Sequence, residues 1–352
     1  MFWGPHDLTR QHIANPSPTP GHPSADRYLL VKGKAGLGNR LLCTLSSILY
    51  AEITGRKLYI DWTDEIFYGL NGKNGFTELF DAPRVTVPEP FWDSDSVTPV
   101  TWQGNLRRSA SEFIDEQEPD RKEPDACPRI AAKYTIDLGN LNYSERVAVR
   151  WAWNDELWRL RPHLKGAHSA WAELSDEEIL QKLAQRLVLA PIVLTRAEDF
   201  RNREFRQVTI GMHIRYTDRK NSYAKYDGIA SRIMRNHPTA AVFLATDNKA
   251  VEDDLRRRYP HLIVTPKWFA PPGTPLHRTR ECPDALERSV EALIEMYLLS
   301  RCDYLIYDST STYGIMARLF SQAPPENVWN TAPKFASGLR RLRHHIRETF
   351  GY

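Results

Sequence analysis

The sequence predicts an α/β protein with two doubly wound domains, and three observations support this. The 352 residues exceed what one hydrophobic core usually supports, so two domains are expected. Short apolar strand patterns alternate with helical patterns in both halves, which is typical of parallel sheets covered by helices. Hydrophobic residues make up 41% of the chain and aromatic residues 11%, which excludes a largely disordered protein.

The first half opens with a tail and then a βαβ unit. Residues 1–26 are rich in Pro and Ser without periodicity, which predicts a disordered tail. A strand is expected at 28–32, followed by a glycine-rich loop at 33–40 and a helix that stops at Gly55. A second strand follows at 57–62. This order of elements predicts that the two strands are parallel.

The middle of the chain carries weaker signals. Residues 63–150 mix aromatic, proline and acidic residues without a sustained period, which predicts long surface loops and short elements. Residues 154–199 are mainly helical, interrupted at Pro162 and Pro191, and are expected to bridge the domains. A tryptophan ring can stack on a sugar but more often packs in a core. The tryptophans concerned are Trp92, Trp102, Trp151 and Trp153.

The second half repeats the alternation of strands and helices. Strands are expected at 208–214, 241–246, 261–264 and 304–307, with helices at 248–259 and 284–301. A last helix, about 335–350, is long enough to return to the first domain. The expected division is a tail (1–26), a first domain with the helical bridge (27–200), a second domain (201–332) and the C-terminal helix (333–352).

Charge and composition exclude several classes of protein. The chain has 47 Lys and Arg residues and 44 Asp and Glu residues. The resulting net charge of +3 is too small to indicate a nucleic-acid-binding protein. Arginines and histidines between 340 and 347 suit a basic helix face, which is either solvated or in peripheral contact with lipid phosphate. The chain shows no apolar run of about 20 residues and no signal-peptide order, so a cytoplasmic location is expected. The four cysteines match no metal pattern and require no disulfide.

The glycine-rich loop at 33–40 fits neither familiar nucleotide motif. Walker A needs Lys and Ser or Thr after its last glycine, whereas Asn39 and Arg40 follow Gly38. The dinucleotide fingerprint lacks its third glycine because Leu41 stands there. Two interpretations remain. The loop approaches a ligand beside a helix N-terminus that favours anions, or it is a tight structural turn.

Polar residues follow three strands of the second half. Arg215 and Asp218 end the strand that contains His213, Asp247 ends the next, and Ser309–Thr312 follow the last. Ligands of open α/β sheets bind beyond the carboxyl ends of the strands, so these groups are expected in one crevice. Arginine and hydroxyl donors there suit an anion such as a diphosphate. The competing interpretations are a solvated loop after the first strand and a helix cap at Ser309–Thr312.

Glu295 lies in a segment that is apolar all round and is therefore expected to be buried. A buried carboxylate without a partner costs several kcal/mol, so a partner is required. A basic side chain would provide a structural salt bridge. A guanine base would serve equally, because its N1–H and amino group present two donors.

These residues also carry a resemblance to a known family. The segments are G-M-H-I-R-Y-T-D (211–218), F-L-A-T-D (243–247), E-M-Y-L-L-S-R-C (295–302) and S-T-S-T (309–312), with G-L-G-N-R (36–40) in the first half. In this order they resemble the fucosyltransferase superfamily, most closely NodZ and related α1,6-fucosyltransferases. Residues 63–200 match weakly.

The resemblance implies a GT-B architecture, in which two Rossmann-like domains with parallel sheets face a central cleft. It implies an acceptor carbohydrate on the first domain, GDP-fucose on the second, and inverting transfer without a metal or other cofactor. The implied donor-site residues are Asn39, Arg40, His213, Arg215, Asp247, Glu295, Thr310, Ser311 and Thr312. Arg215 would bind the β-phosphate, Asp247 and Glu295 would contact ribose and guanine, and Asn39 and Arg40 would close over the sugar-phosphate.

The catalytic base is open. In relatives that fucosylate glycan cores, the segment after the H-x-R arginine continues to a glutamate, which this chain lacks. Asp218 is the candidate, with Asp227 behind it, although Asp218 equally suits an ion pair that orients Arg215. A non-catalytic GDP-sugar- or carbohydrate-binding protein is the alternative function. The acceptor and the linkage position are not predicted, since their contacts are expected in the loops between 63 and 200.

Overall fold

The computed structural model describes residues 26–64, 73–81, 91–119, 128–217, 223–274, 279 and 281–333. The predicted tail, apart from Asp26, and the predicted helix at 335–350 lie outside these residues. Asp218, the candidate base, also lies outside them. None of the helices in the described part of the chain is long and apolar enough to cross a membrane.

The first half contains a four-stranded parallel sheet in the order β2-β1-β4-β3. Its strands are β1 (Tyr28–Lys32), β2 (Lys57–Asp61), β3 (Val97–Thr98) and β4 (Val147–Arg150). In the centre of the sheet, Leu30 pairs with Tyr59 on one side and with Val149 on the other. The predicted parallel βαβ unit is therefore confirmed.

Helix α1 (Leu37–Thr54) joins β1 to β2 and ends where Gly55 adopts a left-handed conformation with φ of 65°. The expected stop at Gly55 is confirmed, because glycine takes positive φ without steric cost. The other helices of this half are α3 (Gly75–Leu79), α4 (Ala110–Gln117), α5 (Pro128–Tyr134), α6 (Leu157–Leu160), α7 (Ser169–Ala172) and α8 (Asp176–Ala184). Single 3₁₀ turns lie at Val100–Trp102, Arg161–His163, Gly166–His168 and Pro325–Asn327.

The second half contains a five-stranded parallel sheet in the order β7-β6-β5-β8-β9. Its strands are β5 (Thr209–Ile214), β6 (Ala241–Thr246), β7 (Leu262–Ile263), β8 (Tyr304–Tyr307) and β9 (Val328–Asn330). The four strands expected in this half are present, and β9 adds an edge strand that was not expected. The crossovers place helices on both faces of this sheet.

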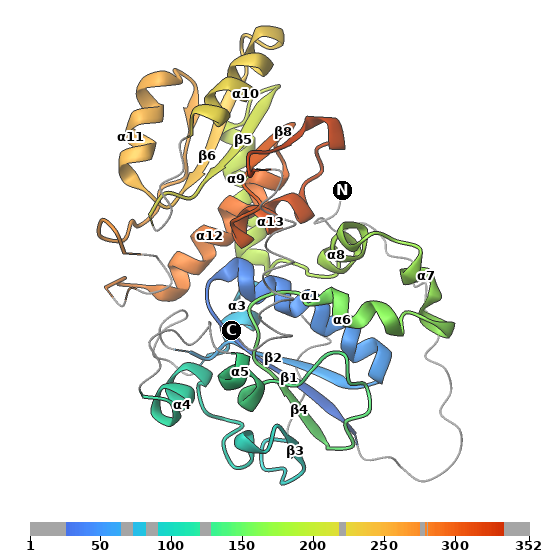
Figure 1. The fold of residues 1–352 in the computed structure, drawn as a ribbon. Helices are drawn as coiled ribbons and strands as arrows, with labels where there is room; N and C mark the ends of the chain where they lie inside the picture. Colours follow the sequence, from blue (N-terminus) through green and yellow to red (C-terminus); the bar gives the residue numbers. More distant parts are fainter. Residues whose placement is uncertain are drawn as a thin grey trace.

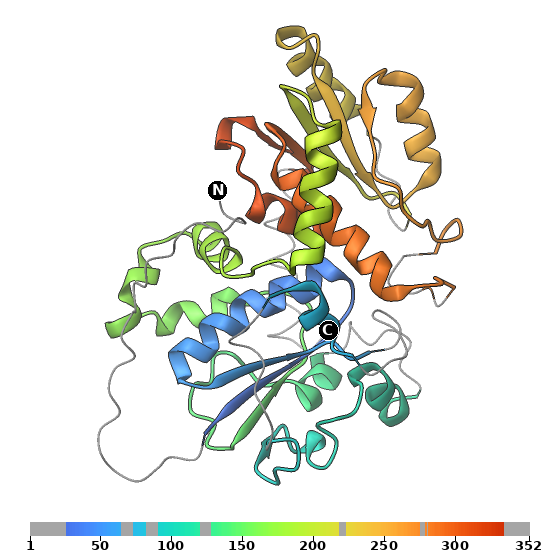
Figure 2. The same ribbon diagram turned by 180° about the vertical axis from the view of Figure 1, so that it is seen from behind.

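The helices of the second half form two layers (Figures 1 and 2). One hydrophobic cluster joins α10 (Ala224–Asn236) and α11 (Lys249–Arg258) to one face of the sheet. Another joins α9 (Pro191–Glu204), α12 (Ala285–Ser300) and α13 (Thr312–Phe320) to the opposite face. The predicted domain division at residues 200/201 falls within α9 and stays a prediction.

The two halves meet through helices rather than through the sheets. Helix α1 packs against α13, and a single buried cluster extends from the first sheet through α1 and α8 to α12 and α13. Figure 1 shows α1 and α13 side by side between the two sheets. Three cysteines in the described residues are free: Cys43 and Cys302 are buried, and Cys282 is partly exposed.

Candidate functional site

The carboxyl ends of β5, β6 and β8 lie side by side, since these strands are parallel and adjacent. The structure therefore brings Arg215, Asp247 and Ser309–Thr312 to one edge of the sheet, as expected. A carboxylate oxygen of Asp247 accepts a hydrogen bond of 2.8 Å from the backbone N–H of Tyr216. Thr217 donates its hydroxyl to the carbonyl of Asp247 at 2.9 Å. These two bonds hold the loops after β5 and β6 together.

His213 is buried at the end of β5, with 6% of its surface exposed. Its ring stacks on Tyr313 of α13 with centroids 4.9 Å apart. Burial, together with the nearby charges of Arg215 and Lys267, lowers the pKa of His213 to about 3. The imidazole is therefore neutral at physiological pH, and its Nδ1 has no hydrogen-bond partner in the described structure.

Ser311 precedes the first residue of α13 and is 3% exposed. It is the N-cap residue by position, but its side chain makes no capping hydrogen bond, and its buried Oγ has no partner among the described residues. The helix-cap interpretation therefore fails for this hydroxyl. Thr310 donates its backbone N–H to Asp308 at 2.7 Å, and Thr312 is the first residue of α13.

The two unpartnered atoms lie at the same helix end. A Cβ built on Gly314, in the first turn of α13, would lie 3.0 Å from Nδ1 of His213. The start of a helix also presents unpaired N–H groups and a positive partial charge. Arg215 follows at the end of β5, half-buried. This helix end, with the neutral His213 and the cationic Arg215 beside it, suits an anionic ligand.

Glu295 of α12 is buried, as predicted, at 6% exposure. Its carboxylate accepts hydrogen bonds from Thr265 Oγ1 at 2.7 Å and from Lys267 Nζ at 2.5 Å. The basic partner expected for this carboxylate is therefore Lys267, while a contact with guanine stays a prediction. Thr265 and Lys267 were not predicted from the sequence. Both follow the carboxyl end of β7, where ligand-binding residues of an open α/β sheet are expected.

Arg40 is engaged within the first half of the chain. Its Nη1 forms an ion pair of 2.7 Å with Asp64, its Nε donates to the carbonyl of Ala35 at 2.8 Å, and only 4% of the residue is exposed. The guanidinium packs so closely over Gly33 that a side chain there would overlap it. In this structure Arg40 fixes the glycine-rich loop, and a contact with the donor sugar stays a prediction, as it does for the half-buried Asn39.

The tryptophans of the first half mainly serve packing. Trp102 is fully buried and donates its indole N–H to the carbonyl of Tyr134 at 2.9 Å. Trp151 is also buried, with the ammonium of Lys34 3.6 Å from the centre of its ring. Packing rather than sugar stacking is thus the observed role of these two rings.

Asp227 is bound by neighbouring side chains, and the described residues contain no cluster of metal-binding side chains. Asp227, the second candidate base, pairs with Arg258 at 2.6 Å and accepts the hydroxyl of Tyr259 at 2.8 Å, on the side of α11. Among the residues that the structure describes, no group of three or more His, Cys, Asp and Glu could hold a metal ion. That the reaction needs no metal stays a prediction.

Comparison with known proteins identifies the relatives of this chain. The family described as Nodulation protein Z (NodZ) matches residues 169–326. Nodulation protein Z of Azorhizobium caulinodans is 25% identical over 348 residues, covering 89% of this chain and 96% of that protein. The protein of the same name from Bradyrhizobium diazoefficiens is 24% identical over 331 residues, covering 85% of this chain and 80% of the relative. Over most of its length the chain is similar to NodZ.

Solved NodZ structures share the fold. The fucosyltransferase NodZ from Bradyrhizobium superposes with a TM-score of 0.54 at 20% identity, covering 84% of this chain and 94% of that one. NodZ α-1,6-fucosyltransferase co-crystallized with GDP gives 0.52 at 22% identity, covering 84% and 93%. The predicted GT-B fold is thereby confirmed. The NodZ family match contains the whole edge from His213 to Thr312 but not the glycine-rich loop.

Proposed function

We propose that this protein is an inverting glycosyltransferase that transfers L-fucose from GDP-fucose to a hydroxyl of a carbohydrate acceptor. One observation carries the proposal: Ser311 Oγ and His213 Nδ1 flank the start of α13 beside Arg215, and both are buried without a hydrogen-bond partner among the described residues. Buried polar atoms normally have hydrogen-bond partners, and a ligand bound at this edge would provide them. NodZ has been crystallized with GDP and soaked with GDP-fucose, which supports a GDP-sugar as that ligand.

The diphosphate is proposed to lie at the start of α13. Hydroxyls of Thr310, Ser311 and Thr312 and the free N–H groups of the helix can donate to its oxygens. Arg215 offers two parallel donors that match phosphate geometry and offset the charge that develops on departing GDP. His213 adds a hydrogen bond without adding charge, because its low pKa keeps the ring neutral.

The nucleoside is proposed to lie across Asp247 and Glu295. A carboxylate has about four acceptor positions, and Thr265 and Lys267 occupy two at one oxygen of Glu295. The remaining capacity suits the paired donors of guanine. Asp247 has an oxygen bound to the backbone N–H of Tyr216, which fixes the carboxylate for a ribose hydroxyl.

The acceptor hydroxyl must lose a proton during transfer. Asp218 remains the proposed base, because it follows Arg215 by three positions in the sequence and because Asp227 is engaged by Arg258 and Tyr259. An Asp218→Asn variant is expected to bind GDP normally and to lose most turnover. A variant that loses GDP affinity instead would assign Asp218 to orienting Arg215.

Incubation with GDP-fucose and a panel of oligosaccharides, with GDP release as the readout, tests the proposal. We expect release that depends on an oligosaccharide, is unaffected by EDTA, and is much slower with GDP-mannose. Tight binding of GDP without turnover on any acceptor would favour the non-catalytic alternative. No binding of GDP at millimolar concentration would overturn the proposed transferase and leave only a carbohydrate-binding role.

A further inference from the structure

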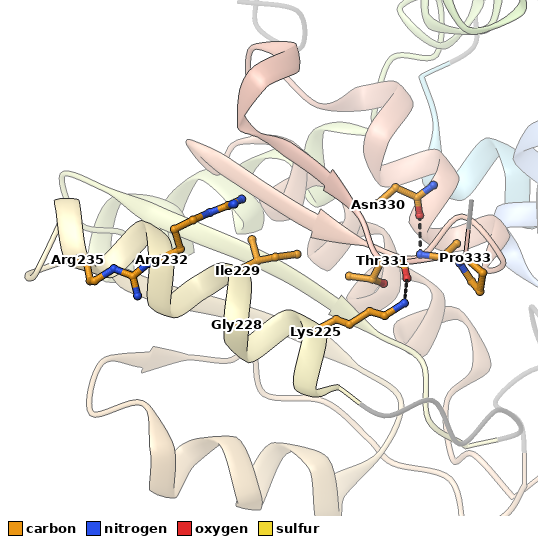
Figure 3. Close-up of a pocket in the computed structure, with 9 residues that line it drawn as sticks. Lys225, Gly228, Ile229, Arg232, Arg235, Asn330, Thr331 and Pro333 are labelled. Atoms are coloured by element: carbon orange, nitrogen blue, oxygen red, sulfur yellow. Dashed lines mark hydrogen bonds between the residues drawn. The ribbon is translucent and has the colours of Figure 1, made fainter. Parts of the chain in front are cut away.

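A pocket lies on the outer face of the second sheet, between α10 and the end of β9 (Figure 3). Its volume is about 490 Å³, within the usual range for small-molecule sites of roughly 300–1,000 Å³. The residues that line it are Lys225, Gly228, Ile229, Arg232, Arg235, Asn330, Thr331, Ala332 and Pro333. Three of them are cationic and none is acidic.

The cations are gathered on one side of α10 by its helical period. Lys225, Arg232 and Arg235 are separated by seven and three positions, which returns them to one face. The acid of this helix, Asp227, is directed to α11, where Arg258 and Tyr259 bind it. Charge is therefore segregated across α10, with the positive face toward the pocket.

Neutral groups hold two of these cations, Lys225 and Arg232, in place. Lys225 donates to the backbone carbonyl of Thr331 at 3.2 Å (Figure 3). The guanidinium of Arg232 lies 5.7 Å from the centre of the Trp329 ring, which itself stacks on Tyr304. None of the three forms an ion pair with a carboxylate of the described residues, so their charge is available to a ligand.

The pocket is also open where a ligand would enter. A Cβ built on Gly228 would meet no atom within 4 Å, so the glycine leaves free space at the centre of the cationic face. The side chain of Asn330, in contrast, is already engaged: its amide donates to Ser309 Oγ at 2.8 Å and its oxygen accepts from the N–H of Ser309 at 3.0 Å. Recognition would therefore depend on the cations.

We propose that this pocket binds a soluble polyanion that carries two or more phosphate or carboxylate groups. Lys225 and Arg235 are ten positions apart, or about 15 Å along the helix, which exceeds a single phosphate and suits a chain of charged groups. Arginine forks match phosphate and carboxylate oxygens, and the contacts are charge-assisted. Asn330 lines the pocket and donates a hydrogen bond to Ser309 in the loop before α13. Ser309 directly precedes Thr310, which belongs to the proposed donor site.

Calorimetric titration of the whole protein with sodium tripolyphosphate at low salt tests the proposal. We expect saturable binding that weakens with salt, and a loss of affinity of about tenfold or more in Arg232→Gln/Arg235→Gln, since two charge-assisted contacts disappear. The matched control is Lys182→Gln/Arg203→Gln, which removes two exposed charges outside the pocket and is expected to stay within twofold.

A steric variant separates shape from charge. Gly228→Leu fills the open space without changing charge and without lowering helix propensity, so affinity is expected to fall while the melting temperature does not. Equal affinity in the pocket and control variants would overturn the proposal, and so would binding that only Arg215→Ala abolishes. Flotation with phosphatidylglycerol vesicles is the second arm. Vesicle binding that depends on Arg232 and Arg235, without tripolyphosphate binding, would overturn the proposed soluble ligand and assign this face to lipid binding.

Discussion

Gly38 lies directly against the peptide bond that precedes Tyr313. A Cβ on Gly38 would come within 2.5 Å of the carbonyl carbon of Thr312 and the nitrogen of Tyr313. The start of α1 in the first half therefore touches the start of α13 in the second, backbone to backbone. Of the two roles considered for the glycine-rich loop, the structure shows close packing at Gly38, and this contact fixes the distance between the halves.

Gly38→Ala is expected to force these two helix ends apart. The added methyl group meets backbone atoms, which cannot rotate away, and overpacking of this kind typically costs about 1–3 kcal/mol in the free energy of unfolding. Urea unfolding checks the cost, and GDP titration checks the site. Gly228→Ala is the control, because its Cβ meets open space and a helical glycine is about 1 kcal/mol less favourable than alanine. Unchanged stability in Gly38→Ala would contradict the contact.

Arg215→Lys is expected to keep the fold and lose most turnover. Lysine retains the charge but lacks the paired donors, and removing one preorganised donor typically lowers the rate about 10²–10³-fold. GDP release at saturating donor measures the loss, with Arg203→Lys on α9 as the control. A rate near that of the wild type would remove Arg215 from the proposed mechanism.

Ser311→Ala is expected to lower affinity for GDP without lowering stability. The hydroxyl has no hydrogen-bond partner among the described residues, whereas a lost hydrogen bond to phosphate lowers affinity about tenfold. Ser300→Ala should show the opposite pattern, because Ser300 is buried far along α12 and donates to the carbonyl of Tyr297 at 2.6 Å. Melting temperature and calorimetric titration distinguish the two. A destabilised Ser311→Ala protein with normal affinity would make this hydroxyl structural.

His213 is expected to make the protein less stable as the pH falls. Its pKa is about 3 in the folded protein and about 6.5 when unfolded, so between these values only the unfolded chain takes up the proton. The free energy of unfolding should lose up to about 1.4 kcal/mol per pH unit below pH 6.5 from this group, and nothing above it. His213→Gln should remove that part of the slope in urea unfolding between pH 7.5 and 5. The control is the exposed His261→Gln; equal slopes in all three proteins would contradict the assignment.

Some elements were predictable because their patterns are local. The strands β5, β6 and β8 are short apolar runs that end in polar residues, and parallel pairing then places Arg215, Asp247 and Ser311 on one edge. Strand β4 was not expected, because four residues buried on both faces give no alternation. Helix α10 was missed because it buries only three residues and contains Gly228.

The partners of charged residues were less predictable. Arg40 meets Asp64 and Glu295 meets Lys267 only after the chain has folded, across 24 and 28 positions respectively. Burial could be inferred for Glu295 from its apolar surroundings, but the choice between a lysine and a nucleotide could not. The pairing of Arg40 with Asp64 depends likewise on tertiary structure alone.

The cysteines provide a separate view of how the molecule opens. Cys43 is buried in α1, and Cys302 is buried beside β5, where burial raises the pKa of its thiol. A buried thiol reacts with a labelling reagent only when its surroundings open. Cys282 is partly exposed and is expected to react first. Mass spectrometry of the native protein during labelling should therefore measure the rate at which each half opens. Equal labelling rates at Cys43 and Cys302 would show that the two halves, which are in contact at Gly38, open as one unit.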